Sequence, residues 1–442
     1  MDACLGVDWG TYSSKWCYQD SIGRIVVGGM WDSRVWRVGD SLAMFSQSRR
    51  YLGEKGVAAL KRKLIHDPGQ AFWEGERSDI KASLGEAVVF SLATLLLDAA
   101  GKLKSAGVDF AKAERIRVRF SHPNWISPEA VAALQCYRDA AVIALSVLKA
   151  GLADADVAND SLAVPLTAIK QLISARQSHA ASLDRFPREY EYKAYSKCAM
   201  GVDDGVEWNF VFESAAAGFP YLAEMEPGLF EGDITPSDAK FRKILVIDIG
   251  AGSTDAGYML RTIRLDSRTL KPNEPILIWM PAAAALDMAG TWLTDQIYAD
   301  WHQQGRKATR TEAEDYKTSG VTDWYSKPYV KKWCDDVASH VAHYIAGVQD
   351  NMRLPHKPFL ELVVTGGSSA VTPVKACLLD HVKEALLARG IGSGVVDGTT
   401  VTQPYVAALK QGGYSETQMA QLAVSLGASH PRMVDLTHYD RL

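Results

Sequence analysis

Short aliphatic runs that end in a carboxylate and a glycine-rich stretch are the clearest pattern along the chain. In the strongest example, Ile244–Ile247 leads to Asp248, and small residues follow over Gly250–Thr254. An aliphatic run of this length predicts a buried strand, and the glycines predict a tight turn. A returning strand is expected from Asp255. Taken alone, an ordinary buried hairpin explains this stretch as well as a phosphate-binding loop does.

The same pattern occurs near the start of the sequence. Leu5–Val7 leads to Asp8, a turn follows at Gly10-Thr11, and a returning strand is expected through Trp16–Tyr18. Small residues let backbone N–H groups approach a phosphate, and a carboxylate at a strand end can organise a hydrated Mg²⁺. This recurrence predicts two similar half-molecules, each with a phosphate loop and a carboxylate.

A third aliphatic run, Leu360–Thr365, has a different exit. It ends in Gly366-Gly367 and leads into a helix predicted from Val371. Glycines at a strand-to-helix junction allow a flat ring or a phosphate to lie against the backbone and the helix N-terminus. A sharp turn that simply requires glycine is the alternative.

The remaining periodicity predicts mostly helices. The segment 151–207 is the hardest to assign, and 261–278 is expected to be strand and loop. Further strands are expected at 116–120 and 208–212, and helices at 80–106, 127–148, 162–177, 281–301, 331–352 and 403–428.

Length and composition indicate an ordinary soluble protein of two domains. The 442 residues exceed the size at which one core usually divides, and we place the domains at 1–235 and 236–442. The chain is 47% hydrophobic and 23% charged, with a net charge of −4, which gives no indication of a nucleic-acid partner.

Cysteine and histidine spacing argues against a metal centre. The six cysteines include no CxxC pair, so neither a zinc site nor a disulfide framework is expected, and a reducing cytoplasm fits. His340 and His343 lie one turn apart near Asp336, but nothing near them in the sequence completes a ligand shell. We interpret them as solvent-facing residues of an amphipathic helix.

No membrane segment is expected. The N-terminal residues lack a basic region and run straight into a strand, and no uninterrupted apolar run is long enough to span a bilayer. The longest candidate, 87–100, contains Ser91, Thr94 and Asp98, and we predict a buried helix of a soluble protein.

Two common nucleotide motifs can be excluded. A dinucleotide fingerprint opens a helix, whereas the residues after Asp255 return as a strand. The P-loop pattern GxxxxGK[ST] does not occur in the sequence.

The three motifs together resemble those of the actin-like ATPase superfamily, which includes actins, sugar kinases and the seventy-kilodalton heat-shock chaperones. The chain looks most like the nucleotide-binding domain of DnaK-type chaperones. The matching segments are 6–11 (first phosphate motif), 246–255 (second phosphate motif), 363–369 (adenosine motif), 117–123 (strand–Pro–helix), 213–217 (glutamate and small residues), and 285–292 with 314–317 (adenine side).

This resemblance implies an α/β protein with the actin-like ATPase fold. Such a fold has two duplicated ribonuclease-H-like lobes, each with a mixed five-stranded sheet flanked by helices, and a nucleotide cleft between them. The implied cofactors are ATP or ADP and Mg²⁺.

The resemblance also implies roles for individual residues. Asp8 and Asp248 would hold Mg²⁺ through water, Asp255 would position the attacking water, and Glu213 would orient water or metal. A lysine that reaches the γ-phosphate would be Lys61, or Lys63 in a register shifted by two residues. The phosphates would contact Gly10, Thr11, Tyr12, Gly250, Ala251, Gly252 and Ser253, and the adenosine would contact Gly290, Glu314, Lys317, Gly366, Gly367 and Ser368.

Several features depart from the chaperone pattern. Ala251 replaces a glycine, Ala370 stands where the chaperones have an arginine that stacks on adenine, and Trp9 is bulky beside the first loop. Only residues 369–442 follow Ser368, and they are needed to finish the second lobe, so no substrate-binding sandwich or helical lid is expected.

The expected function is therefore that of a cytoplasmic ATP-hydrolysing switch, chaperone-like, that acts on a separate protein partner. The segment 151–207, with Tyr190, Tyr192 and Tyr195, is a candidate partner surface, although such aromatic residues also occur in cores. A bacterial actin-like filament protein is the structural alternative. A small-molecule kinase would need a base such as Asp255 and an acceptor-binding motif, and we find no such motif.

Overall fold

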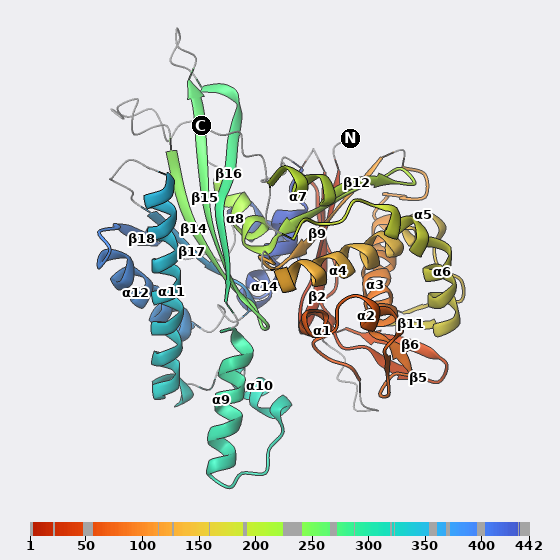
Figure 1. Cartoon of the computed structure of the whole chain (residues 1–442), viewed down its shortest axis with the longest axis horizontal. Helices are drawn as coiled ribbons and strands as arrows, with labels where there is room; N and C mark the ends of the chain where they lie inside the picture. The colour runs from red at the N-terminus through yellow and green to blue at the C-terminus, as the bar shows by residue number, and fades with distance from the viewer. Residues whose placement is uncertain are drawn as a thin grey trace. The chain divides into compact units, whose positions relative to one another are not determined.

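The chain forms two compact units of mixed α/β structure. A computed structural model describes residues 3–20, 23–46, 56–113, 115–125, 128–158, 160–188, 192–223, 241–265, 272–286, 288–318, 321, 323–352, 360–367, 372–395, 403–431 and 433. The first unit comprises Met1–Phe212 and Ala428–Asp435, and the second comprises Glu213–Gly427 and Leu436–Leu442. Figure 1 labels their helices and strands.

The first unit is built on a seven-stranded mixed sheet. Its order is β12-β13-β9-β1-β2-β3, and β4 also pairs with β2. Strands β1, β2 and β3 are antiparallel neighbours, whereas β1, β9 and β13 run parallel. The bounds are β1 Cys4–Trp9, β2 Ser13–Gln19, β3 Ile25–Val27, β4 Trp31–Asp32, β9 Ile116–His122, β12 Met200–Asp203 and β13 Val206–Phe212.

The long apolar helix predicted over 80–106 is α3, Leu84–Ser105. It begins with a capping box in which the Ser83 hydroxyl accepts from the Glu86 N–H and the Glu86 carboxylate accepts from the Ser83 N–H. Its buried Asp98 accepts hydrogen bonds from the indoles of Trp16 at 2.7 Å and Trp31 at 3.1 Å. The buried carboxylate of Asp98 therefore ties α3 to the sheet.

Smaller elements complete the first unit. A second sheet has the order β10-β11-β6-β5, and β7 pairs with β8. Their bounds are β5 Trp36–Val38, β6 Ser41–Phe45, β7 Glu76–Arg77, β8 Ala82–Ser83, β10 Asp156–Ala158 and β11 Ser161–Pro165. The helices are α1 Leu60–His66, α2 Gln70–Glu74, α4 Pro128–Leu145, α5 Val147–Ala150, α6 Leu166–Ser182 and α7 Tyr192–Cys198.

The second unit repeats the central strand order of the first. Its sheet is β16-β15-β14-β17-β18, with β14, β15 and β16 antiparallel and β14, β17 and β18 parallel. In both units the first strand of the hairpin thus lies between its antiparallel partner and a parallel strand. The bounds are β14 Phe241–Ile249, β15 Thr254–Leu265, β16 Pro272–Leu286, β17 Leu360–Thr365 and β18 Ser393–Val395.

Strand β14 is aliphatic without interruption over 244–247 because both of its faces are buried there. Leu245 and Ile247 belong to the core cluster formed with α11 and α12, which pack side by side (Figure 1). Val246 points to the other face, where a Cβ at Gly218 of α8 would lie 2.4 Å from its Cγ2. A strand covered on both sides shows no polar alternation.

The helices of this unit are α8 Glu213–Ala223, α9 Gly290–Gln303, α10 Arg310–Thr318, α11 Pro328–Met352, α12 Thr372–Leu387, α13 Gln403–Gln411 and α14 Glu416–Ala428, with a 3₁₀ turn at Asp323–Ser326.

Most of the predicted elements are confirmed. The three motif strands, the strands at 116–120 and 208–212, and the long helices at 80–106, 127–148 and 331–352 all occur, with shifted ends. The second sheet has the five strands expected, whereas the first has seven because β4 and β12 add to it.

The helix predicted over 281–301 is wrong in its first third. Ala282–Ala285 pair with Asp255–Tyr258 as the end of β16, and the helix begins only at Gly290. Alanine favours helices, but pairing with β15 along the sheet outweighs that preference. Pro281 is tolerated because β16 is an edge strand.

The prediction of one helix over 162–177 is also partly wrong. Ser161–Pro165 pair with β6 as a strand, and α6 starts at Leu166. The alternation of Leu162 and Val164, both buried, is the strand signal within this stretch.

Within the part of the chain that the structure describes, two helices are long and apolar enough to cross a membrane, Leu84–Ser105 and Ala130–Ala150. In each, 78% of the most apolar stretch is buried inside the protein. The first contains residues 87–100, which were predicted as a buried helix.

The close approach of α14 to α8 makes one glycine indispensable. A Cβ at Gly427 would lie 1.6 Å from the Ala216 carbonyl oxygen. We expect Gly427→Ala to lower the free energy of unfolding by about 1–3 kcal/mol, because the helices must separate. Gly347→Ala on α11, where nothing lies within 4 Å, is the control and should stabilise by about 0.5–1 kcal/mol. Urea denaturation measures both, and equal effects would contradict the packing argument.

Candidate functional site

The two strand–Asp–turn–strand motifs occupy the same place in their respective sheets. Asp8 is the penultimate residue of β1, and Asp248 is the penultimate residue of β14. Across the hairpin, Asp8 lies opposite Lys15, whereas Asp248 lies opposite Asp255. Residues paired in this way share one face of the sheet. The repeated motif therefore carries a charge pair in the first unit and two like charges in the second.

In the first hairpin the carboxylate already has a cation beside it. Asp8 is 4% exposed, and its Oδ2 lies 2.6 Å from Nζ of Lys15. The other oxygen accepts a hydrogen bond from Ser121 at 3.1 Å, which β9 brings alongside β1. Neither Lys15 nor Ser121 was predicted as a site residue. A lysine opposite Asp8 across a short turn was the available signal for Lys15.

The first loop is a close turn that requires glycine. A Cβ at Gly10 would lie 2.2 Å from the Ser13 carbonyl oxygen. Thr11 is buried, and the carbonyl of Tyr12 accepts a hydrogen bond from the Ser33 N–H at 3.1 Å. The bulky Trp9 is fully buried and stacks on Tyr137 with ring centroids 5.0 Å apart. Its indole therefore belongs to the core.

Burial favours Lys61 over Lys63 as the inward-facing lysine. Lys61 is 5% exposed within α1, whereas Lys63 is half-buried. A run of basic residues such as 61–63 is usually a solvated face. Here Lys61 is buried, Lys63 is half-buried and Arg62 is exposed. Lys61 also acts electrostatically on His122 at the end of β9.

His122 is buried and neutral. Desolvation lowers its pKa from 6.5 to about 3; the hydrogen bond to the Pro123 carbonyl opposes this shift, and the positive charge of Lys61 adds to it. Nδ1 lies 2.6 Å from that carbonyl oxygen, and Nε2 lies 2.6 Å from the Tyr195 hydroxyl. A neutral ring that donates through Nδ1 and accepts through Nε2 satisfies both contacts.

Tyr195 does not support the prediction that the segment 151–207 offers a partner surface. This side chain is 3% exposed and hydrogen-bonded to His122, so it belongs to the core. Tyr190 and the side chain of Tyr192 lie outside the described part of the chain.

The second hairpin holds two buried carboxylates face to face. Asp248 is 4% exposed and Asp255 is 1% exposed. The Ser253 hydroxyl donates to Asp255 at 2.6 Å, and the turn is closed by a 2.9 Å bond from the Gly250 N–H to the Ser253 carbonyl. Like charges directly opposite each other are destabilising. A divalent cation bound through water would offset this repulsion, so the pair fits Mg²⁺.

The third motif lies directly against the second. Gly366 has a φ of +89°, and a Cβ there would lie 2.3 Å from Oδ1 of Asp248. Because β17 runs parallel to β14, the carboxyl ends of both strands lie at the same end of the sheet. Only glycine leaves room there for the carboxylate. A Cβ at the neighbouring Gly367 would contact Gln421 at 3.5 Å, and Ser368 lies outside the described residues.

Helix α9 is attached to the second loop by its first N–H groups. The Gly290 N–H donates to the Gly250 carbonyl, and the Thr291 N–H donates to the Ala251 carbonyl, both at 3.0 Å. Gly290, which the resemblance assigns to the adenosine side, thus lies beside the second phosphate motif. These two N–H groups of α9 are therefore occupied by carbonyl oxygens of the loop. Gly252 and its neighbours Ala251 and Ser253 are half-buried, so the loop is partly accessible to solvent there.

Lys317 and Glu314 connect α10 to the first turn of α9. Lys317 Nζ donates to the Gly290 carbonyl at 2.8 Å, and to Thr294 and Glu314 at 2.9 Å each. Burial lowers the pKa of Lys317, and the adjacent Glu314 carboxylate partly opposes this shift. At 3% exposure the ammonium is engaged by protein oxygens, whereas Glu314 is partly exposed. This lysine therefore positions the wall of the candidate site.

Glu213 stands where the chain leaves the first unit. It is the first residue of α8, is 6% exposed, and follows directly on Phe212, the last residue of β13.

Most of the predicted residues of the second unit are joined by contacts: Asp248, Gly250, Ala251, Ser253, Asp255, Gly290, Glu314, Lys317 and Gly366.

No family model matches the sequence, and no curated protein matches it either.

The buried neutral His122 predicts a defined pH dependence of stability. Its folded pKa of about 3 lies below its ordinary value of 6.5, so below pH 6.5 the unfolded chain binds the additional proton. Stability should be retained above pH 6.5 and lost as the pH falls toward 3, by about 1.4 kcal/mol per unit from this residue. Denaturation of wild type and His122→Gln at several pH values measures the difference in slope. Identical slopes would show that His122 titrates normally.

Proposed function

We propose that the protein binds and hydrolyses ATP with Mg²⁺, as an actin-like ATPase closest to the nucleotide-binding domain of DnaK-type chaperones. One observation carries this proposal: sheets of the same central strand order present Asp8 and Asp248 at equivalent positions, each before a glycine turn. Two sheets with a shared order are what a duplicated fold requires. A turn-capping aspartate explains either motif alone but not their equivalent placement.

The residues fit the group that the proposal requires. Asp8 and Asp248 would hold Mg²⁺ through water, and the cation would neutralise charge on the phosphates. Asp255, fixed by Ser253, would orient the attacking water, and Glu213 would assist it. Lys15, whose ammonium lies 2.6 Å from Asp8, would be a phosphate-binding cation in addition to Lys61.

The loops supply the remaining contacts. Gly10 and Thr11 in the first unit, and Gly250 to Ser253 in the second, would present backbone donors to the phosphates. Gly366 and Gly367, with Glu314 and Gly290, would form the adenosine side, where Lys317 holds Glu314 in place. Phosphoryl transfer to water needs in-line placement and charge neutralisation more than covalent chemistry, and these groups are of the kinds that provide both.

The proposed role is that of a conformational switch for a separate protein partner in the cytoplasm. Among the described residues, the chain passes between the units at Phe212–Glu213, where α8 begins, and at Gly427–Ala428, where α14 ends. These two helices also meet at Gly427 and Ala216. A change at the nucleotide loops could therefore reach both connections through elements of the second unit.

Replacing either equivalent aspartate tests the proposal. We expect Asp8→Asn and Asp248→Asn each to lower phosphate release from Mg-ATP by about 10²-fold or more, because each removes charge that holds the cation. Asp156→Asn, on the exposed strand β10, is the matched control and should leave the rate unchanged.

Three outcomes would count against this function. If the wild-type protein neither binds nor hydrolyses ATP with Mg²⁺, the proposal is wrong. ATP-dependent sedimentation of the protein alone would favour a filament-forming ATPase instead. Phosphate transfer to a small-molecule hydroxyl, with little release in its absence, would favour a kinase.

A further inference from the structure

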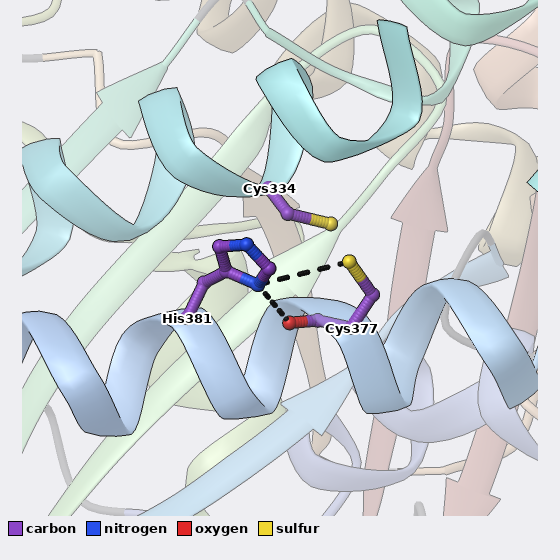
Figure 2. Close-up of side chains that lie close together, drawn as sticks. All are labelled: Cys334, Cys377 and His381. Atoms are coloured by element: carbon purple, nitrogen blue, oxygen red, sulfur yellow. Dashed lines mark hydrogen bonds between the residues drawn. The ribbon is translucent and has the colours of Figure 1, made fainter. Parts of the chain in front are cut away.

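A cluster of two thiols and one imidazole lies between helices α11 and α12, apart from the candidate nucleotide residues. Cys334 comes from α11, and Cys377 and His381 come from successive turns of α12 (Figure 2). One ligand atom from each residue lies within 4.8 Å of those of the other two. Cys334 is fully buried, and the other two are half-buried.

We propose that Cys334, Cys377 and His381 bind one Zn²⁺ ion, with solvent as the fourth ligand. Two thiolates and an imidazole form a donor set that suits zinc, whereas Mg²⁺ requires oxygen ligands. This site is independent of the proposed ATP chemistry.

The spacing of the donors is close to that of a tetrahedral site. Zinc–sulfur bonds of about 2.3 Å and zinc–nitrogen bonds of about 2.0 Å place neighbouring ligand atoms about 3.5–3.8 Å apart. Sγ of Cys377 already lies 3.7 Å from Nδ1 of His381. Figure 2 shows the ring edge of His381 and both sulfurs facing one shared space. The partial exposure of Cys377 and His381 gives the ion an access route.

The far side of the imidazole carries the partner that zinc-binding histidines usually have. Nε2 of His381 lies 3.1 Å from Oδ1 of Asp335 on α11. A carboxylate on the remote nitrogen fixes the ring and favours the tautomer that presents Nδ1 to the metal. Nδ1 also lies 2.7 Å from the Cys377 carbonyl oxygen, so binding the ion would require the proton on Nδ1 to leave to solvent and the ring to turn away from that oxygen.

Cys334 is fully buried on α11, so it faces the space between α11 and α12 and not solvent. Zinc would then cross-link the two helices that cover one face of the second sheet.

Sequence spacing concealed this cluster. Cys334 and Cys377 lie far apart in the chain, and no CxxC pair marks them. The available signal was Cys377-x₃-His381, which puts two ligands on one face of a helix. His340 and His343, which the spacing did single out, are exposed on α11, as expected.

Cobalt and zinc titrations of the full-length reduced protein test the site. We expect one equivalent of Co²⁺ to give a thiolate-to-metal charge-transfer band and intense tetrahedral visible bands, both displaced by one equivalent of Zn²⁺. Zn²⁺ should also raise the melting temperature, because it binds the folded state. Mg²⁺ should do neither.

Variants assign the ligands. Cys377→Ala and His381→Ala should each weaken zinc binding by at least about 10-fold and abolish or shift the cobalt bands. Cys198→Ala and His340→Ala are the controls and should bind as the wild type does. Asp335→Asn should weaken binding about 10-fold while keeping the charge-transfer band, as expected of a positioning residue.

The proposal is overturned if the wild-type protein gives no charge-transfer band with Co²⁺, or if the band survives in both Cys377→Ala and His381→Ala. Circular dichroism of each variant verifies folding, and the half-buried positions of Cys377 and His381 make both substitutions tolerable. Loss of ATP turnover with intact zinc binding, or the reverse, would separate this site from the proposed ATPase.

Discussion

Two buried carboxylates that face each other across one hairpin are the constraint on which the second unit depends. Asp248 and Asp255 are paired in register on β14 and β15, and almost no solvent reaches either. Gly366 leaves the space that the Asp248 carboxylate occupies. The turn, the exit of β17 and the start of α9 are arranged around this pair. Like charges directly opposite each other are destabilising, and the Ser253 hydroxyl donates a hydrogen bond to one member of the pair, Asp255.

The two hairpins show how one backbone pattern acquires different electrostatics. In the first unit, Lys15 lies opposite Asp8 and neutralises it within the protein. In the second, the equivalent position holds Asp255. The shared strand order therefore carries side chains of opposite charge across the hairpin from the equivalent aspartates. Under the proposed function both Asp8 and Asp248 would hold the cation, and Lys15 would add a phosphate-binding charge in the first unit.

The helices of the second unit hold the surroundings of the Asp248–Asp255 hairpin in place. Lys317 ties α10 to α9, while α11 and α12 cover the face that carries Leu245 and Ile247. The Cys334–Cys377–His381 cluster sits between those two covering helices. A metal there would restrain the helix that follows Gly366-Gly367, since α12 begins at Thr372. The Asp248–Asp255 pair and the thiol cluster thus lie on different elements of the same unit.

The sequence by itself determined the strands of the three motifs, because aliphatic runs followed by glycine are local signals of a buried strand and its turn. It also determined the candidate residues Asp8 and Asp248, since the motif around them repeats, and the resemblance of the motifs added Asp255. Only the tertiary structure decided that Ala282–Ala285 pair as a strand, that Lys15 and Ser121 contact Asp8, and that Cys334 meets Cys377 and His381. These outcomes depend on which segments pack together over long sequence separations, and local periodicity carries no information about that packing.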